Sequence, residues 1–432
     1  MKGINLLYKK ADVVIVGAGI AGLTAAYLLQ KKGYKVHVFE AAQQVGGRIR
    51  TDKVEGFLLD RGLQLFHTAY PELKSVIDIK RLNVKPIYNG TLIRHNGDFN
   101  LISNPSKEFK DILSTAIASN GTWKDKMKMI KFLAEANSLN ESKLITKNDL
   151  PADQYLKEFG FSEKFINSFF RPFLASSCLD NDMKTPSRLL KFIFKMFDKG
   201  VVGLPEKGMG SIPYQLADKL EKGTVHLQSK VKKVSAAGIQ LLKGDFITAD
   251  RVLIATNSLA LNHLLPGYES DLNSNSVSCL YFAMEEPPVT KPIIVLNGDE
   301  KGLVNNLCVV SLVQPSYAPK GSHLIAVNIT KKHDYDDEEL VDEVLKELVQ
   351  WFGIKVNDWQ HLRTYHIKYA LPQENQMAAD EYAIQHNDNV FICGDHLSYG
   401  SMNAAVKSGK VAAELLHKSL RKAKKDSPVH RE

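Results

Sequence analysis

The sequence predicts an α/β fold that contains a parallel sheet and is joined to a second domain. Three observations lead to this prediction. The chain has 432 residues, enough for two domains with separate cores. Residues 12–40 show the order strand, helix, strand. The middle of the chain carries helical patterns up to about residue 203, and alternating apolar and polar residues typical of strands after residue 261.

The first strand-helix-strand segment has a characteristic glycine pattern. Residues 12–16 (DVVIV) are apolar and β-branched like a buried strand, and GAGIAG follows at 17–22. A helix is expected over 23–32, ending at Gly33, and a second strand over 35–40. Residues 13–29 are uncharged, but their three glycines and β-branched first half argue against a membrane-spanning helix. The segment therefore predicts a Rossmann-type unit that binds a dinucleotide.

Each part of this unit has a physical task. Gly17 permits the tight turn from strand to helix, Gly19 lets a pyrophosphate approach the backbone, and Gly22 lets the helix pack close to the strand. Backbone N–H groups at the start of the helix, in the Ile20-Ala21 region, suit phosphate oxygens. Glu40, at the end of the second strand, can accept hydrogen bonds from a ribose diol.

The next segment favours FAD over NAD as the dinucleotide. Gly46 and Gly47 expose backbone N–H groups where a loop would return toward the pyrophosphate, and Arg48 supplies a forked cation for phosphate oxygens. The segment GFLLDRG follows and ends at Gly62, which we include among the expected cofactor contacts.

A second cofactor motif is expected near the C-terminus. Residues 390–393 predict a buried strand, and Gly394-Asp395 turns at its end, where α/β sheets bind ligands. Asp395 could accept a hydrogen bond from the flavin ribityl chain. A helix is expected from Asn403 to about residue 420, with Ser401 and Met402 just before it. Its N-terminus would stabilise negative charge on a reduced flavin.

Together these motifs resemble the flavin amine oxidase superfamily, which includes monoamine oxidase, protoporphyrinogen oxidase and the phytoene desaturases. Residues 204–213 look like the family's proline-glycine segment, 225–234 with Val231 like its adenine-side strand, and 252–257 like a further flavin-domain strand. The resemblance runs from residue 11 to about 415. It implies an amine oxidase-like, Rossmann-type FAD-binding domain with a discontinuous α+β substrate domain.

The resemblance also implies how the chain divides. We expect residues 1–75, 204–260 and 362–432 to form the FAD-binding domain, and 76–203 and 261–361 the substrate domain. A helical insert at 105–203 would contain helices at 105–118, 123–137, 149–159, 162–170 and 186–197. A sheet-containing insert at 261–361 would contain strands at 278–282 and 324–329 and a helix at 336–352. The charged tail after residue 417 is expected to fray.

Two segments of the helical insert leave alternatives open. Residues 188–197 are aromatic and basic, typical either of a helix at a membrane surface or of a core helix with solvated lysines. Residues 171–173 (RPF) suggest a turn, and a similar segment lies near the substrate cavity of related desaturases. Arg171 is therefore the one candidate catalytic side chain. No hydrolase or phosphate-transfer motif occurs, so the chemistry is assigned to the flavin.

Departures from the amine oxidase branch bear on the substrate. Ser401 stands where that branch has an aromatic cage residue, residues 276–282 lack its lysine, and no cysteine occurs at 396–400 to bind flavin covalently. We expect non-covalent FAD that takes a hydride from a lipophilic, isoprenoid-like substrate as in phytoene desaturases, with oxygen or a quinone as electron acceptor. The alternatives are amine or protoporphyrinogen oxidation, a redox-neutral flavin isomerase, and a flavin-free carrier of hydrophobic ligands.

Composition excludes some other classes of function. The net charge of +8 is modest, and no nucleic-acid-binding motif accompanies it. Four scattered cysteines predict buried thiols, and their spacing with histidines indicates no metal site. Residues 1–10 show no signal-peptide pattern. We expect a cytoplasmic protein, with contact at a membrane surface as the alternative that residues 188–197 raise.

Overall fold

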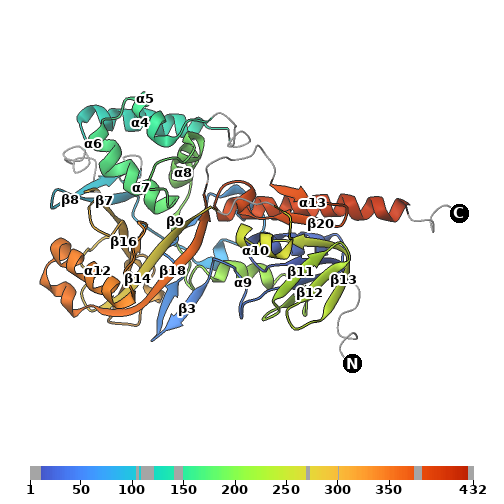
Figure 1. Cartoon of the computed structure of the whole chain (residues 1–432). Helices are drawn as coiled ribbons and strands as arrows, with labels where there is room; N and C mark the ends of the chain where they lie inside the picture. The colour runs from blue at the N-terminus through green and yellow to red at the C-terminus, as the bar shows by residue number, and fades with distance from the viewer. Residues whose placement is uncertain are drawn as a thin grey trace.

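The computed structural model describes residues 11–103, 107–108, 121–140, 149–268, 273–299, 301–373 and 382–426. Two sequence expectations lie outside these residues: the absence of a signal peptide at 1–10, and the helix at 105–118. Figure 1 shows one sheet with the long helix α13 (Met402–Asp426) at one end of the molecule, and a second sheet and a group of helices at the other.

The first sheet has eight strands and a parallel centre. Strand β1 (Ala11–Val16) lies between β2 and β13, and its side chains alternate between two apolar clusters. Helices α1 (Ile20–Lys31) and α13 cover one face, and α10 (Ser258–Leu264) lies on the other. The predicted Rossmann-type fold is confirmed. The remaining strands are β2 (Val36–Phe39), β10 (Val225–His226), β11 (Val231–Ser235), β12 (Gly238–Leu241), β13 (Phe246–Ile254), β19 (Ala383–Gln385) and β20 (Val390–Cys393).

The second sheet has seven strands, and helix α12 (Asp337–Phe352) packs on one of its faces. The boundary expected at residue 362 falls within a strand of this sheet, because β18 (Gln360–Pro372) pairs along its length with β14. The sheet also takes β7 and β8 from before the helical insert. Its other strands are β14 (Ser274–Met284), β17 (His323–Ile329), β16 (Asn306–Val309), β15 (Ile294–Asn297), β7 (Gly90–His95) and β8 (Asp98–Ser103).

A group of helices, here called the helical lobe, packs around an aromatic core. The aromatic and basic segment at 188–197 lies in helix α8, and most of its apolar side chains are buried, which supports the core interpretation. Its lysines are not solvated as expected, because Lys195 is buried and Lys191 is largely buried. The turn expected at 171–173 is instead helical: it is the start of α7, which continues directly from the helical turn at 166–170. The lobe contains α4 (Trp123–Ser138), α5 (Ala152–Phe159), α6 (Glu163–Phe165), the π-helical turn η4 (Ile166–Phe170), α7 (Arg171–Ser177) and α8 (Ser187–Lys199).

Two further expectations are corrected by local contacts. Residues 225–234 form two strands rather than one, because Gln228 takes a left-handed conformation (φ 52°) between them. The tail after residue 417 does not fray at once: α13 runs to Asp426, Leu420 is buried, and the Ser419 hydroxyl accepts a hydrogen bond from Arg251. Buried contacts therefore hold this part of the helix against the first sheet.

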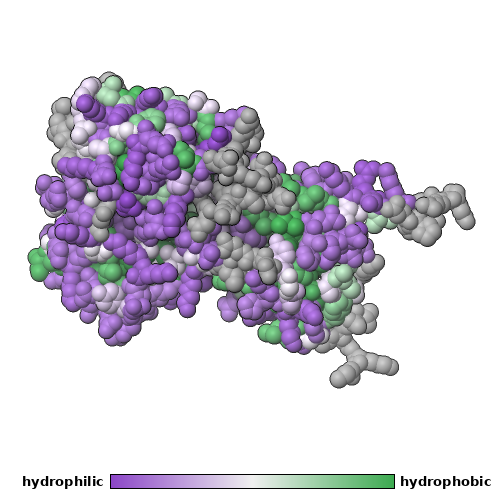
Figure 2. Space-filling view, turned by 45° about the horizontal axis from the view of Figure 1, so that its top comes forward, coloured by the Kyte–Doolittle hydropathy of each residue, from purple (hydrophilic) through white to green (hydrophobic). Residues whose placement is uncertain are grey.

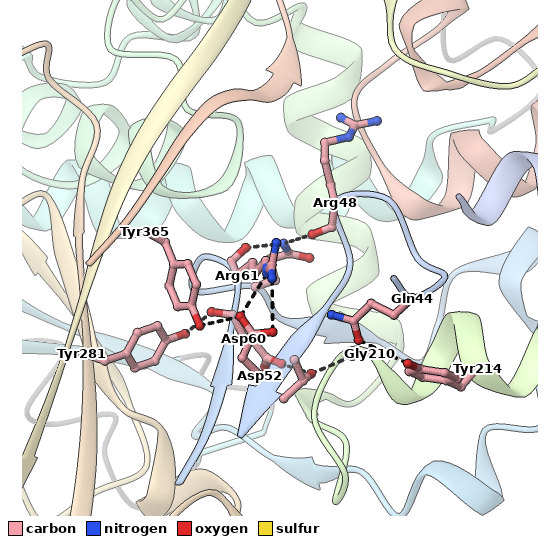
Figure 3. A network of polar contacts seen from close by, with 11 residues as sticks. Gln44, Arg48, Asp52, Asp60, Arg61, Gly210, Tyr214, Tyr281 and Tyr365 are labelled. Carbon is pink, nitrogen blue, oxygen red and sulfur yellow. Dashed lines mark hydrogen bonds and ion pairs between the residues drawn. The ribbon is translucent and has the colours of Figure 1, made fainter. Parts of the chain in front are cut away.

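A buried carboxylate at the end of β4 (Phe57–Asp60) lies beside the second sheet (Figure 3). Asp60 accepts hydrogen bonds from the hydroxyls of Tyr317 (2.6 Å) and Thr51 (2.5 Å) and from the backbone N–H of Met209 (2.9 Å). Its carbonyl oxygen accepts from Tyr281 of β14 (2.8 Å). Burial raises the pKa of Asp60 to about 6, although these donors oppose the shift.

The raised pKa of Asp60 predicts a pH dependence of stability. Because its ordinary value is 3.8, the folded state binds the proton more tightly than the unfolded state between pH 4 and 6. This contribution to the free energy of unfolding is full below about pH 4 and falls by about 3 kcal/mol as pH rises through about 6. Urea unfolding of the wild type and of Asp60→Asn at a series of pH values measures it. Parallel pH profiles for the two proteins would contradict the assignment.

Candidate functional site

The loops that follow four parallel strands begin side by side at one edge of the first sheet. Val16 pairs with Phe39 of β2 and with Ile254 of β13, and Ile254 pairs with Ile392 of β20. The carboxyl ends of these strands therefore meet in one row. This edge is where open α/β sheets bind ligands.

The glycine turn after β1 has the shape that the sequence predicts. Gly17 has φ +107°, and a Cβ there would lie 2.6 Å from the carbonyl oxygen of Ala255. A Cβ on Gly22 would overlap the carbonyl oxygen of Gly17, whereas one on Gly19 would meet nothing within 4 Å. No side chain caps the N-terminus of α1, which begins at Ile20 and Ala21. The turn thus leaves open space in front of a helix N-terminus that favours anions.

Glu40 lies beside this turn, directly after β2. Its side chain is buried, and its two carboxylate oxygens accept hydrogen bonds from the backbone N–H groups of Ala18 and Ala42, each at 2.9 Å. Each oxygen keeps a second lone pair for another donor. The backbone N–H of Ser229 donates to the Glu40 carbonyl, which brings the segment before Val231 next to the same loop. Val231 itself is buried at the start of β11.

The loop at 45–48 returns over the glycine turn, as predicted. The backbone N–H of Gly46 donates to the carbonyl of Ala18 (2.8 Å). A Cβ on Gly47, which has φ +61°, would lie 3.5 Å from the Cα of Gly19. The two glycine-rich segments therefore face each other across a short gap.

Arg48 forms an ion pair with Asp395 across the strand edge. Its Nη2 donates to the Asp395 Oδ1 (2.5 Å), its Nη1 donates to the carbonyl of Ala370 (3.0 Å), and its guanidinium lies over the ring of Tyr369. Burial opposes the charge of Arg48, but the attraction of Asp395 prevails and raises its pKa. The sequence indicated both residues, but it did not indicate that they pair with each other.

The start of α13 holds three more of the predicted residues. The Ser401 Oγ accepts from the backbone N–H of Ala404 (3.0 Å) and so caps the helix. The Asn403 side chain is held by the backbone N–H of Glu72 and by Tyr399, and Met402 packs on the main core. Ser401 and Asn403 therefore position the helix through their side chains.

Two predicted residues lie elsewhere. Gly62 has φ +90°, and a Cβ there would lie 3.0 Å from Ile367 of β18, so it marks where β4 meets the second sheet. Arg171 lies in the helical lobe, where its guanidinium donates to the Asn167 side chain and to the carbonyl of Asn181. These bonds give Arg171 a structural role, and its part in catalysis stays a prediction.

Several polar residues at this edge were missed in the sequence. The Ser408 hydroxyl accepts from the backbone N–H of Gly394 (2.7 Å) and fixes the turn after β20. Both ring nitrogens of His396 and the Ser398 hydroxyl are buried and have no hydrogen-bond partner. Burial lowers the pKa of His396 to about 4, so its ring is neutral at pH 7. The sequence signal that could have identified His396 and Ser398 was their position directly after Gly394-Asp395. Unsatisfied buried groups of this kind indicate a site that a ligand completes.

An aromatic cluster adjoins the start of α13. Tyr399 packs edge-on against Phe192 of α8, Phe192 stacks on Tyr70, and Tyr70 stacks on His67. Burial lowers the pKa of His67 to about 4, so this ring is also neutral at pH 7. The cluster connects the helical lobe to the strand edge through uncharged side chains.

A polar network supports the loop that carries Arg48 (Figure 3). Asp52 accepts from Arg61 (3.0 Å) and from the Tyr365 hydroxyl of β18 (2.8 Å), and Gln64 donates to the carbonyl of Arg48. These bonds fix the hairpin of β3 (Thr51–Val54) and β4 against the second sheet. A polar cavity of about 470 Å³ beside the network is lined by Gln43, Gln44, Arg50, Asp52, Arg61 and Tyr214.

Other kinds of site are not found in the described part of the chain. Residues 11–426, apart from the gaps given above, contain no cluster of three or more histidine, cysteine or acidic side chains suited to a metal ion. Among the same residues, each helix is too short or too polar to span a bilayer. All four cysteines are buried, as predicted.

Comparison with known proteins supplies the family. A family model described as flavin containing amine oxidoreductase matches residues 20–417. Protoporphyrinogen oxidase 2 of Arabidopsis thaliana is 30% identical over 44% of this chain and 38% of its own length. The 15-cis-phytoene desaturase of an Oncidium hybrid is 25% identical over 60% of this chain and 48% of its own length. The matches thus span less than half the length of these two curated relatives.

A solved structure supports the same fold. An oxidoreductase from Methanosarcina mazei superposes with a TM-score of 0.70 at 19% identity, over 92% of this chain and 99% of that protein. Because the family model covers most of the 432 residues, this chain belongs to the flavin-containing amine oxidoreductases, and its cofactor is FAD.

Proposed function

We propose that the chain oxidises a lipophilic, isoprenoid-like substrate and introduces a C–C double bond. FAD, when bound, would supply the redox chemistry by accepting a hydride from one carbon, the neighbouring carbon would release a proton to water, and oxygen or a quinone would take the electrons afterwards. The observation that carries the proposal is the neutral aromatic cluster at the start of α13, formed by His67, Tyr70, Phe192 and Tyr399. Its side chains orient an apolar substrate and exclude water.

The strand edge fits FAD, and we propose a role for each residue there. Gly19 and the uncapped start of α1 would receive the pyrophosphate, and the free lone pairs of Glu40 would accept from the ribose. Arg48 and Asp395 would meet the phosphate and ribityl groups, respectively. The unsatisfied nitrogens of His396 and hydroxyl of Ser398 support a polar ligand at the same edge.

Two features favour desaturation over amine oxidation. Ser401 caps α13, and strand β14 contains no lysine, so this chain lacks the aromatic cage residue and the lysine of the amine oxidase branch. The aromatic cluster offers no charge to balance a substrate ammonium group, whose desolvation would then be costly.

Anaerobic reduction of bound FAD tests the substrate class. We expect the visible absorbance of oxidised flavin to fall when a lipophilic polyene with saturated C–C bonds is added, and to stay unchanged with primary amines. Stopped-flow absorbance measures both rates in the same preparation. Rapid reduction by an amine or by a porphyrinogen, with none by the polyene, would replace the proposal by one of those two activities.

Substitutions at two glycines of the same turn distinguish an effect on cofactor binding from an effect on folding. Gly19→Ala adds a methyl group to open space where the pyrophosphate would approach, so we expect near-normal stability of the FAD-free protein and at least about tenfold weaker FAD binding. Gly22→Ala adds the same group against the carbonyl of Gly17, so we expect a loss of about 1–3 kcal/mol in the free energy of unfolding. Urea unfolding and FAD titration measure both effects. Unchanged FAD affinity in Gly19→Ala would remove the assigned role of this turn.

A further inference from the structure

Helix α4 carries a stripe of exposed apolar side chains on its outer face. Trp123 is 69% exposed, Met127 48% and Ile130 54%, and Ala134 continues the row. At about 100° per residue these positions share one side of the helix. The opposite side, with Phe132 among others, is buried in the aromatic core of the lobe. In the described residues no other helix exposes three large apolar side chains to this extent.

Lysines lie on both sides of this stripe. By the same helical spacing, Lys126 lies on one side, and Lys124 and Lys131 lie on the other, with Lys128 farther round. By the same spacing, the two acids of the helix lie away from the stripe. Asp125 is buried and accepts hydrogen bonds within the helix cap, and Glu135 is paired with Lys191 (3.3 Å). The outer face of α4 is therefore apolar along its centre and basic along its edges.

We propose that α4 docks the protein on an anionic membrane surface. Trp123, Met127 and Ile130 would enter the boundary between headgroups and acyl chains, and the flanking lysines would contact anionic headgroups. Long lysine side chains suit this arrangement, because their stems lie along apolar surface while the ammonium groups stay in water. Membrane contact is thus assigned to α4 rather than to α8, because most apolar side chains of α8 are buried and α4 packs over it.

A second copy of the chain fits this face less well than a membrane does. In a twofold dimer through α4, the lysines of one copy would meet the lysines of the other. The 16 residues of α4 span only about 24 Å, and one helix face of that length falls well short of the roughly 800 Å² per partner of a stable interface. An anionic lipid surface satisfies both the apolar row and the basic edges.

The position of α4 leaves the FAD edge accessible. Figure 1 shows α4 on the outer side of the helical lobe, at the opposite end of the molecule from the tail of α13. Figure 2 turns this side forward and shows hydrophobic atoms scattered among hydrophilic ones over the lobe. Docking through α4 needs no turnover, so the inference stands apart from the proposed oxidation.

Vesicle binding by the full-length, FAD-loaded protein tests the proposal. We expect co-sedimentation with phosphatidylcholine vesicles that contain phosphatidylglycerol, weaker binding to phosphatidylcholine alone, and release by salt. Of the three tryptophans, Trp351 and Trp359 are each only 8% exposed, so a blue shift of fluorescence on binding reports mainly on Trp123. Trp123→Ser/Ile130→Ser should abolish sedimentation, and Lys124→Glu/Lys131→Glu should weaken it at least about tenfold.

Matched variants on other surfaces serve as controls. Leu242→Ser/Ile354→Ser removes two side chains of comparable exposure (59% and 73%), and Lys243→Glu reverses an exposed charge away from α4. Both should bind vesicles like the wild type, with the flavin absorbance confirming that each variant is folded. The proposal is overturned if the wild type binds no vesicles, if it binds without a fluorescence shift, or if the α4 variants still bind. It is also overturned if the wild type is a dimer that Trp123→Ser/Ile130→Ser dissociates.

Discussion

Strands β2, β1, β13 and β20 run parallel and end in register, although they come from three distant parts of the chain. Their backbone pairing determines where every later feature of the site can lie. The glycine turn, the loop after Glu40 and the Gly394-Asp395 turn each begin at the end of one of these strands. Because β1 is buried on both faces, a shift of register would expose apolar side chains and displace all the loops together.

The Arg48–Asp395 ion pair links the segment that follows β2 to the segment that follows β20. The two residues are separated by 347 positions in sequence, and Arg48 belongs to a loop whereas Asp395 begins the short 3-10 helix η7 (Asp395–Leu397). Asp395 is buried and Arg48 is partly buried, so loss of either partner would leave the other charge unbalanced, and each residue restricts where the other's segment can go. The same pair places a cation and an adjacent carboxylate next to Gly47. The two side chains proposed to contact the cofactor thus also hold two segments of the chain together.

The sequence predicts the Rossmann-type unit well, because β1, α1 and β2 depend on local patterns and on glycines with a specific steric task. It predicts less where distant contacts decide the outcome. The reversal at Gln228 splits one apparent strand into two, and the contacts of Ser419 and Leu420 extend α13 beyond its apolar pattern. The composition of β18 does not indicate that this strand pairs with β14. The division into two domains and the cofactor roles of single residues stay predictions.

Tertiary context also decides what each amphipathic helix does. The aromatic and basic residues of α8 suggest a surface helix, but α4 covers them and carries the exposed stripe instead. Aromatic side chains from α8 then reach Tyr399 at the start of α13. Helix α8 thus joins the core of the lobe to the strand edge, and its neighbour α4 faces outward.

The central claim is that this strand edge holds FAD without a covalent bond. The most direct measurement is the absorption spectrum of the purified protein, followed by denaturation and separation of protein from small molecules. The account predicts a flavin spectrum in the native protein and free FAD in the protein-free fraction. A colourless protein that stays colourless after incubation with FAD, or flavin that remains attached to the denatured chain, would contradict it.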